Sequence, residues 1–289
     1  MDFGVFAQDD SPSGSNFSAE KYATPKPRRF ASDSCYNPAM KTIVVANWKM
    51  NPATMREAKR LFEVTRRAAE RARHTAVIVA PPTIFLRELS HGYRASKIAF
   101  AAQNAHFESA GAYTGELSLL QVRDARARYV LVGHAERRAM GESDDDICKK
   151  VSAAIATRIT PILCVGEESR SGGGEHFDIV REQLRAGLAD VAASNLSRIL
   201  LVYEPLWTIG VKTTMSPREM HQMAIFLRKC VVDSHGEGGR TLKILYGGSV
   251  DEKNAAAMLR EGDVRGFLVG RASINAVEFA ELLQAVDQT

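Results

Sequence analysis

The chain has 289 residues, of which 45% are hydrophobic and 25% charged, and its formal net charge is +4. These proportions are typical of a soluble globular protein and exclude a disordered chain or a collagen-like repeat. No apolar run reaches the roughly 18 residues that a membrane-spanning helix requires, and a net charge this small does not indicate a nucleic-acid partner. The four cysteines form no C-x-x-C pair, so we expect reduced thiols in a cytoplasmic protein, with neither disulfide framework nor thiolate zinc site.

The first 39 residues differ in composition from the rest of the chain. They are rich in Ser, Pro and Asp, and they hold too little apolar surface to offset the entropy lost on ordering. We therefore expect a disordered N-terminal extension at 1–39 and one folded domain at 40–289. The extension lacks the apolar segment of a secretory signal. Two origins stay open for it: a tail of the native protein, or a start codon assigned upstream of a native start at Met40.

From Met40 onward, short runs rich in β-branched residues alternate with longer segments whose apolar residues recur at helical spacing. The predicted strands are 42–46, 76–80, 98–103, 129–133, 160–165, 199–204, 242–246 and 266–269. The predicted helices are 55–73, 82–89, 118–127, 144–157, 177–193, 216–232, 252–260 and 276–285.

The predicted strands carry no regular polar alternation, which indicates burial on both faces, as in a parallel sheet. Strands and helices that alternate eight times favour an α/β fold closed into a single (β/α)8 barrel, whose usual size is about 250 residues. An open doubly wound sheet fits the same alternation and stays open as an alternative.

Polar side chains follow several predicted strands, at the end where a parallel barrel carries its chemistry. Lys49 follows the first strand, His134 the fourth and Glu204 the sixth. Turns that contain Gly and open helices follow the seventh and eighth strands, at Gly247-Gly248-Ser249 and Gly270-Arg271. Each feature alone has a structural explanation, such as a helix-start carboxylate for Glu204. Together they suit proton transfer beside a carbonyl on a substrate that carries a phosphate.

Four motifs at these strand ends carry a family resemblance. They are Asn47-Trp48-Lys49-Met50-Asn51, Gly133-His134-Ala135-Glu136-Arg137-Arg138, Tyr203-Glu204-Pro205-Leu206-Trp207 and Tyr246-Gly247-Gly248-Ser249-Val250. In order and spacing they resemble the triosephosphate isomerase family, and the resemblance extends over about 41–285. It implies a TIM barrel that needs no cofactor and no metal ion. It also implies an isomerase that interconverts dihydroxyacetone phosphate and D-glyceraldehyde 3-phosphate through an enediolate, in glycolysis and gluconeogenesis.

The resemblance implies a role for individual residues. Glu204 corresponds to the catalytic base, His134 to the neutral electrophile, and Lys49 to the cation at the substrate oxygens. The implied substrate-binding residues are Asn47, Lys49, Gly210, Ser249, Gly270 and Arg271. Residues 205–214 correspond to a mobile lid that Tyr246 and Ser249 latch. The loop at 107–116, with Thr114 near the partner's active site, implies a homodimer.

Three positions depart from the family pattern. Ala135 stands in place of a Ser whose hydroxyl can hold the base, so we expect an altered resting position of Glu204. Val211-Lys212 replaces Thr-Gly at the lid hinge, and Arg271 replaces the second Gly of the last phosphate turn. Two other functions stay open: an isomerase of a slightly longer sugar phosphate, and a sugar-phosphate-binding barrel without turnover.

Two further features have structural interpretations. We interpret Asp144-Asp145-Asp146 as the start of a helix and not as a metal-binding cluster. Cys164 lies in a predicted buried strand, which indicates a packed thiol and not a nucleophile.

Overall fold

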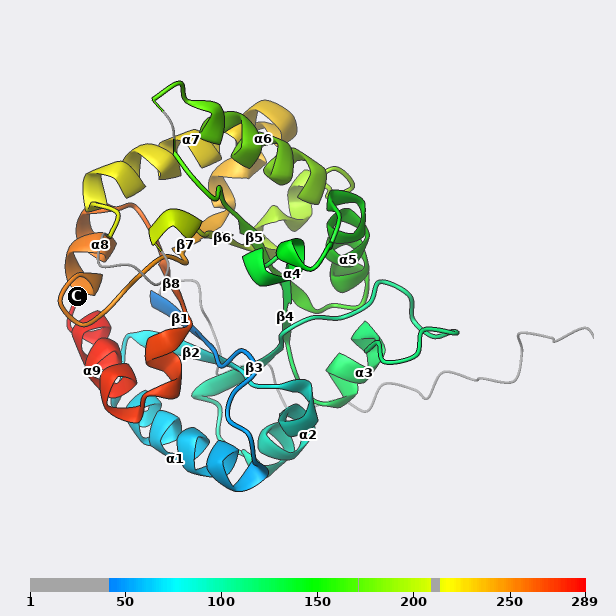
Figure 1. Cartoon of the computed structure of the whole chain (residues 1–289), viewed down its shortest axis with the longest axis vertical. Coiled ribbons are helices and arrows are strands. Elements are labelled where there is room, and N and C mark those ends of the chain that lie inside the picture. The colour runs from blue at the N-terminus through cyan, green and yellow to red at the C-terminus, as the bar shows by residue number, and fades with distance from the viewer. Residues whose placement is uncertain (1–41, 171, 209–213) are drawn as a thin grey trace, which may run out of the picture. The chain divides into compact units, whose positions relative to one another are not determined.

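The computed structural model describes residues 42–170, 172–208 and 214–289, so the predicted extension at 1–39 lies outside the described residues. Within them, parallel strands pair in chain order and close into a barrel in which β1 lies beside β8 (Figure 1). The strands are β1 (Thr42–Asn47), β2 (Thr75–Ala80), β3 (Ile98–Ala102), β4 (Tyr129–Val132), β5 (Thr160–Val165), β6 (Leu200–Tyr203), β7 (Lys243–Tyr246) and β8 (Gly266–Val269). The predicted barrel is confirmed, and the open sheet is excluded.

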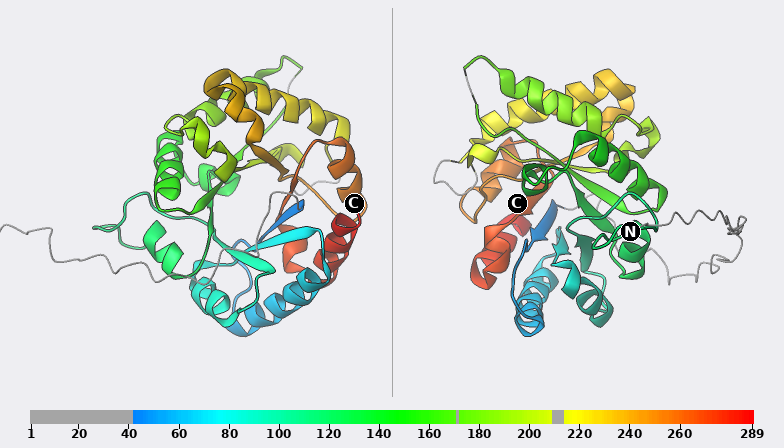
Figure 2. Two further views of the ribbon diagram at one scale, coloured as in Figure 1. Left: turned by 180° about the vertical axis from the view of Figure 1, so that it is seen from behind. Right: turned by 45° about the vertical axis from the view of Figure 1, so that its right-hand side comes forward.

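Helices surround the strands on the outside of the barrel, as the views of Figure 2 also show. The α-helices are α1 (Met55–Arg71), α2 (Thr83–Gly92), α3 (Leu119–Asp124), α4 (Ala135–Ala139), α5 (Asp144–Ala156), α6 (Glu175–Gly187), α7 (Pro217–His235), α8 (Ala255–Glu261) and α9 (Ala276–Asp287). The 3-10 helices are η2 (Ala193–Arg198), η3 (Leu206–Thr208), η4 (Gly236–Thr241) and η5 (Arg271–Ile274). Among the helices described, none combines the length and apolar character that crossing a membrane needs.

Two predicted helices differ from the observed ones at an end where another local structure forms. The helix predicted at 252–260 begins later, because Asp251 first forms a turn in which its Oδ1 accepts the backbone N–H groups of Lys253 and Asn254. The helix predicted at 177–193 ends at Gly187, and a separate 3-10 helix follows before β6. The other predicted elements differ from the observed ones by a few residues at their ends.

The core has two parts because successive residues of a strand point to opposite faces. In β1, Val44 and Ala46 belong to the core between the strands and the helices, which also includes Phe62 of α1. Ile43 and Val45 belong to a second core inside the barrel. Both faces of the strand are therefore buried, which explains why its sequence shows no polar alternation.

Candidate active site

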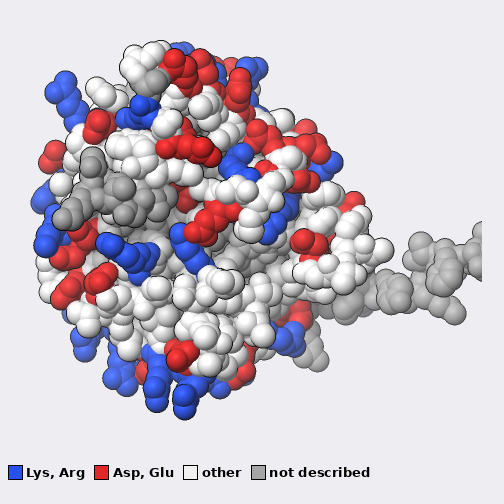
Figure 3. Space-filling model, in the orientation of Figure 1, with Lys and Arg blue, Asp and Glu red and all other residues white. Residues whose placement is uncertain are grey.

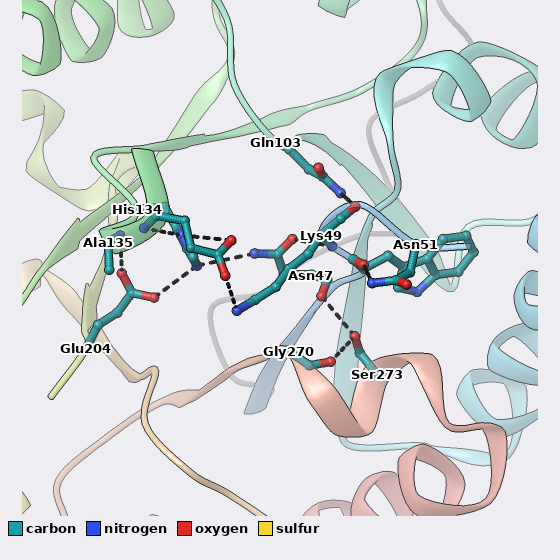
Figure 4. Close-up of polar contacts among 11 residues, drawn as sticks. Asn47, Lys49, Asn51, Gln103, His134, Ala135, Glu204, Gly270 and Ser273 are labelled. Carbon is teal, nitrogen blue, oxygen red and sulfur yellow. Dashed lines mark hydrogen bonds and ion pairs between the residues drawn. The ribbon is translucent and has the colours of Figure 1, made fainter. Parts of the chain in front are cut away.

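The predicted site residues meet at the carboxyl-terminal ends of the strands, around one cavity of about 430 Å³. The three predicted catalytic side chains, Lys49, His134 and Glu204, all line it. The predicted substrate-binding residues that the structure describes line it as well: Asn47, Ser249, Gly270 and Arg271. Figure 4 shows that the side chains of Asn47, His134 and Glu204, at the ends of β1, β4 and β6, point toward one another.

Glu204 follows β6 directly, and its buried carboxylate has two partners. Its backbone N–H still bonds to the carbonyl of Val165 at 2.8 Å, so the strand ladder sets its position. The residue just after the neighbouring strand β5 must be glycine, since a Cβ at Gly166 would lie 1.8 Å from the Glu204 carbonyl oxygen. Oε2 of Glu204 accepts the backbone N–H of Ala135 at 3.1 Å, and Oε1 lies 3.2 Å from Nε2 of His134.

His134 caps the short helix α4 with its own ring. Nδ1 accepts the backbone N–H of Glu136 at 3.2 Å, which requires a lone pair on Nδ1. In the neutral ring the proton therefore sits on Nε2, the nitrogen that faces Glu204. The amide nitrogen of Asn47 approaches the same Nε2 at 3.4 Å. The ring thus presents an N–H donor to the cavity.

Lys49 has a left-handed backbone conformation, with φ of 52°, which is uncommon for a residue other than glycine. Two hydrogen bonds hold it: its N–H donates to Oδ1 of Asn47 at 3.0 Å, and its carbonyl accepts Nε2 of Gln103 at 2.8 Å. Its ammonium lies 2.6 Å from Oε1 of Glu136, and its side chain lies across Gly270, where a Cβ would be 3.2 Å from Lys49 Cε. The sequence predicted no role for Gln103, whose position just beyond β3 was the available signal.

The turn at Gly270-Arg271, which the sequence predicted to bind phosphate, accommodates its departure from the family pattern. Among the described residues, those other than glycine in the left-handed region are Lys49, Arg126, Arg158 and Asp263. Arg271 therefore has an ordinary backbone conformation, and no glycine is needed there. Its side chain is exposed at the cavity, and η5 begins with this residue. Gly210 and the departures at Val211-Lys212 fall within 209–213, outside the described residues.

Tyr246, the predicted latch, is buried at the end of β7. Burial raises the pKa of its phenol, which lies beside the side chain of Thr208 and the backbone of Met215. Those two residues lie on either side of the undescribed segment 209–213. Tyr246 is therefore placed where both ends of the predicted lid meet the barrel.

A buried carboxylate to which the sequence assigned no role lies at the start of the predicted lid segment. Glu167 is fully buried just after β5, and its Oε1 accepts the Tyr203 hydroxyl at 2.7 Å and the Trp207 indole N–H at 2.9 Å. Nε of Arg170 donates to the same oxygen at 2.9 Å. Burial, followed by the Glu167 charge, raises the pKa of Tyr203. The bond from Trp207 ties η3, which leads into the predicted lid segment, to this buried carboxylate.

The acidic run and the buried thiol have structural roles in the fold. Ser143 and Asp146 form a capping box at the start of α5, and Oδ1 of Asp144 accepts Nη1 of Arg138 at 2.7 Å. Among the described residues, no group of His, Cys, Asp and Glu side chains could hold a metal ion. Cys164 is fully buried in β5, and burial raises the pKa of its thiol well above the usual value.

Comparison with known proteins agrees with this geometry. The family model described as triosephosphate isomerase matches residues 42–286. The chain belongs to the triosephosphate isomerase family.

Curated members of the triosephosphate isomerase family align with nearly their whole length. The triosephosphate isomerase of Endomicrobium trichonymphae is 37% identical over 84% of this chain and 98% of that protein. Those of Acidithiobacillus ferrooxidans and Moorella thermoacetica are both 36% identical, over 85% and 83% of this chain and 96% and 97% of their own length. The family model, which matches residues 42–286, includes every strand end described above.

One residue expected from the triosephosphate isomerase family lies away from the cavity. Thr114 is exposed on the long loop between β3 and α3, which protrudes from the barrel in Figure 1. The ring of His106 stacks on Phe107 and on Tyr113 in this loop, with centroids 4.3 Å apart in both pairs.

Around the cavity, basic and acidic side chains are interspersed on the face shown in Figure 3.

Proposed function

We propose that this protein is a triosephosphate isomerase that interconverts dihydroxyacetone phosphate and D-glyceraldehyde 3-phosphate in glycolysis and gluconeogenesis. One observation carries the proposal beyond family membership: a buried carboxylate and a ring N–H, 3.2 Å apart, face one cavity that Lys49 also lines. A carboxylate and a neutral imidazole so placed can remove a proton from carbon and donate a hydrogen bond to the adjacent oxygen.

In the proposed reaction, Glu204 takes the proton from one substrate carbon and returns it to the neighbouring carbon, in the role known for this family. Before substrate binds, its carboxylate contacts the ring N–H of His134 and accepts the backbone N–H of Ala135. The substrate carbonyl replaces it at Nε2 of His134, and the freed carboxylate turns toward the carbon. His134 then stabilises the enediolate through that N–H and moves a proton between its two oxygens. The chemistry uses no cofactor or metal ion.

The negative charge of the phosphate and of the enediolate needs a fixed positive partner. We assign this role to Lys49, whose bound conformation is held by Asn47 and Gln103. The phosphate would rest on the backbone N–H groups of Ser249, Gly270 and Arg271, because such donors are already oriented and carry no proton to lose. The backbone N–H of Gly210 would be a fourth donor to the phosphate. Residues 205–214 would close over the substrate, exclude water and be latched by Tyr246 and Ser249.

We also propose a cytoplasmic homodimer in which the loop at 107–116 inserts into the partner and brings Thr114 near its active site. The exposure of this loop and its internal ring stacking support an insertion surface that is formed before assembly. Light scattering of the purified protein should give the mass of two chains. The mass of one chain would contradict the dimer.

A coupled assay on D-glyceraldehyde 3-phosphate tests the proposed function, with a tetrose phosphate as the comparison. We expect kcat/KM for the triose phosphate to exceed that for the tetrose phosphate by at least about tenfold, because a closed pocket excludes the extra carbon. A preference for the tetrose phosphate would identify an isomerase of a longer sugar phosphate. Binding of both without turnover would identify a barrel that only binds.

A further inference from the structure

Two chain segments that form one edge of the site are paired strands at first and then separate. β1 and β8 are hydrogen-bonded neighbours up to the pair Ala46 and Val269. Beyond this pair, β1 continues into Asn47 and Lys49, while β8 continues into the turn at Gly270 and then η5. The strand ladder ends before the residues that would bind the substrate, so something else must fix the spacing of the two segments.

Ser273 spans this gap with its side chain. It lies in η5 and is fully buried, with a relative exposure of 0%. Its Oγ lies 3.0 Å from the carbonyl oxygen of Asn47 and 2.6 Å from that of Gly270 (Figure 4). A serine hydroxyl has a single proton to donate, so both carbonyls, one on each segment, share it.

The two carbonyls belong to Asn47 and Gly270, both of which are proposed to bind the substrate. The side chain of Asn47 accepts the N–H of Lys49 and approaches His134, so the position of its backbone sets that of the amine. Gly270 lies under the Lys49 side chain and precedes the N–H of Arg271. A shift between the segments would therefore change the distance between the ammonium and the backbone donors.

We propose that Ser273 is a positioning residue that ties the segment of Asn47 and Lys49 to the turn at Gly270. It keeps a constant distance between the Lys49 ammonium and the backbone N–H groups that would bind the phosphate. The inference deepens the proposed function and rests on it, since the spacing matters only for a ligand that meets both groups. Ser273 itself does not touch the substrate.

The barrel offers a matched control in Ser90 on α2. Its Oγ also bridges two carbonyls, that of Arg87 three residues earlier at 3.1 Å and that of Ala125 at 2.6 Å. It is buried to a similar degree, with 3% exposure, and it does not line the cavity. Ser90→Ala thus removes two bonds of the same kind as Ser273→Ala, together with a longer contact of 3.4 Å to Nδ1 of His91, at a place that does not line the cavity.

The experiment compares the wild-type protein, Ser273→Ala and Ser90→Ala by three measurements. These are KM for D-glyceraldehyde 3-phosphate, the dissociation constant of inorganic phosphate by calorimetry, and the melting temperature. We expect Ser273→Ala to raise both constants by about fivefold, the effect of losing one hydrogen bond that orders the site. Ser90→Ala should leave both constants within about twofold, while the melting temperature falls by a similar amount in both variants.

A merely structural role would lower the folded fraction and kcat, and it would leave KM and the phosphate constant unchanged. Equal constants for the two Ala variants would therefore overturn the inference. Should Ser273→Ala fail to fold, Ser273→Cys and Ser90→Cys make the same comparison, because a thiol leaves no cavity and donates only weakly. A wild-type protein without isomerase activity would contradict the proposed function alone, and the phosphate constants would still test Ser273.

Discussion

The backbone N–H of Ala135 donates a hydrogen bond to Oε2 of Glu204 at 3.1 Å, across 69 positions of sequence. Ala135 stands where the family usually has a serine, and its main chain retains a partner for the resting carboxylate. The other oxygen lies beside Nε2 of His134. A missing hydroxyl therefore removes one partner of Glu204, while two others keep the carboxylate in the cavity.

Glu204→Gln tests the base. The amide can still accept the Ala135 N–H, so the fold and the cavity should persist, but it cannot take a proton from carbon. We expect kcat to fall by at least about 100-fold while the dissociation constant of inorganic phosphate stays within about tenfold. The coupled assay and calorimetry measure the two effects. Equal turnover by both proteins would show that Glu204 is not the base.

Arg271→Ala tests whether its guanidinium, at the turn proposed to bind phosphate, contributes positive charge to that binding. The backbone N–H survives this change, and only the exposed side chain is lost. We expect the dissociation constant of phosphate to rise about threefold at low ionic strength, and the difference to shrink near 1 M salt, where the Debye length is about 3 Å. Arg271→Lys keeps the charge and should bind phosphate like the wild type. A salt-independent difference would contradict an electrostatic role.

Lys150→Met tests a buried ion pair that supports the end of β4. Lys150 pairs with Glu142, whose Oε2 accepts the N–H of Gly133 at 3.1 Å, and the two side chains are only 8% and 2% exposed. Removal of the Lys150 cation leaves the buried Glu142 carboxylate without a positive charge beside it. We therefore expect the free energy of unfolding to fall by about 3 kcal/mol. Urea unfolding measures the change.

An exposed pair provides the control for this prediction. Lys229 and Asp233 lie 2.8 Å apart on α7, with side chains 70% and 60% exposed. Lys229→Met should cost less than about 1 kcal/mol, because water already solvates both charges. Equal losses in the two variants would mean that burial does not decide the strength of the Lys150 pair.

Ser216→Ala tests the cap that starts α7 just after the predicted lid segment. The side chain and backbone N–H of Ser216 donate to Glu219 and hold the pKa of that carboxyl below its usual value. A lowered pKa contributes stability that is present above the usual value, about 4.3, and is lost as the pH falls through the lower folded value. We expect a loss of about 1 kcal/mol at pH 7 that shrinks below pH 4.

Ser118 caps α3 in the same way, but its partner is Gln121, which does not titrate. Ser118→Ala should therefore cost a similar amount at either pH. Urea unfolding at pH 7 and near pH 3 compares the two caps. The prediction fails if the Ser216→Ala loss is as large in acid as at neutral pH.

Cys164 should resist alkylation in the folded protein. It is fully buried, and burial raises the pKa of its thiol, so little thiolate exists near neutral pH and the reagent has no access. Iodoacetamide labelling followed by peptide mass spectrometry should find Cys164 unmodified while the half-buried Cys148 reacts slowly. In urea both should react. Rapid labelling of Cys164 without denaturant would contradict its buried, packed role.

The order of elements could be predicted from the sequence, because hydrophobic periodicity is a local property that each segment carries by itself. Apolar runs buried on both faces and separated by helices led to the barrel, and barrel geometry brings strand ends such as Lys49, His134 and Glu204 to one mouth. Helix ends were less predictable where a side chain formed a turn first, as Asp251 does before α8.

The sequence by itself thus determined the fold and the chemical groups at the strand ends. Only the tertiary structure decided which atoms meet: the Ala135 N–H at the carboxylate, the Gln103 amide at the Lys49 carbonyl, and the Ser273 hydroxyl between two segments. Such a contact joins a donor to an acceptor across as many as 226 positions, and it leaves no periodic pattern along the chain. Its existence depends on distances that are set only when the barrel closes.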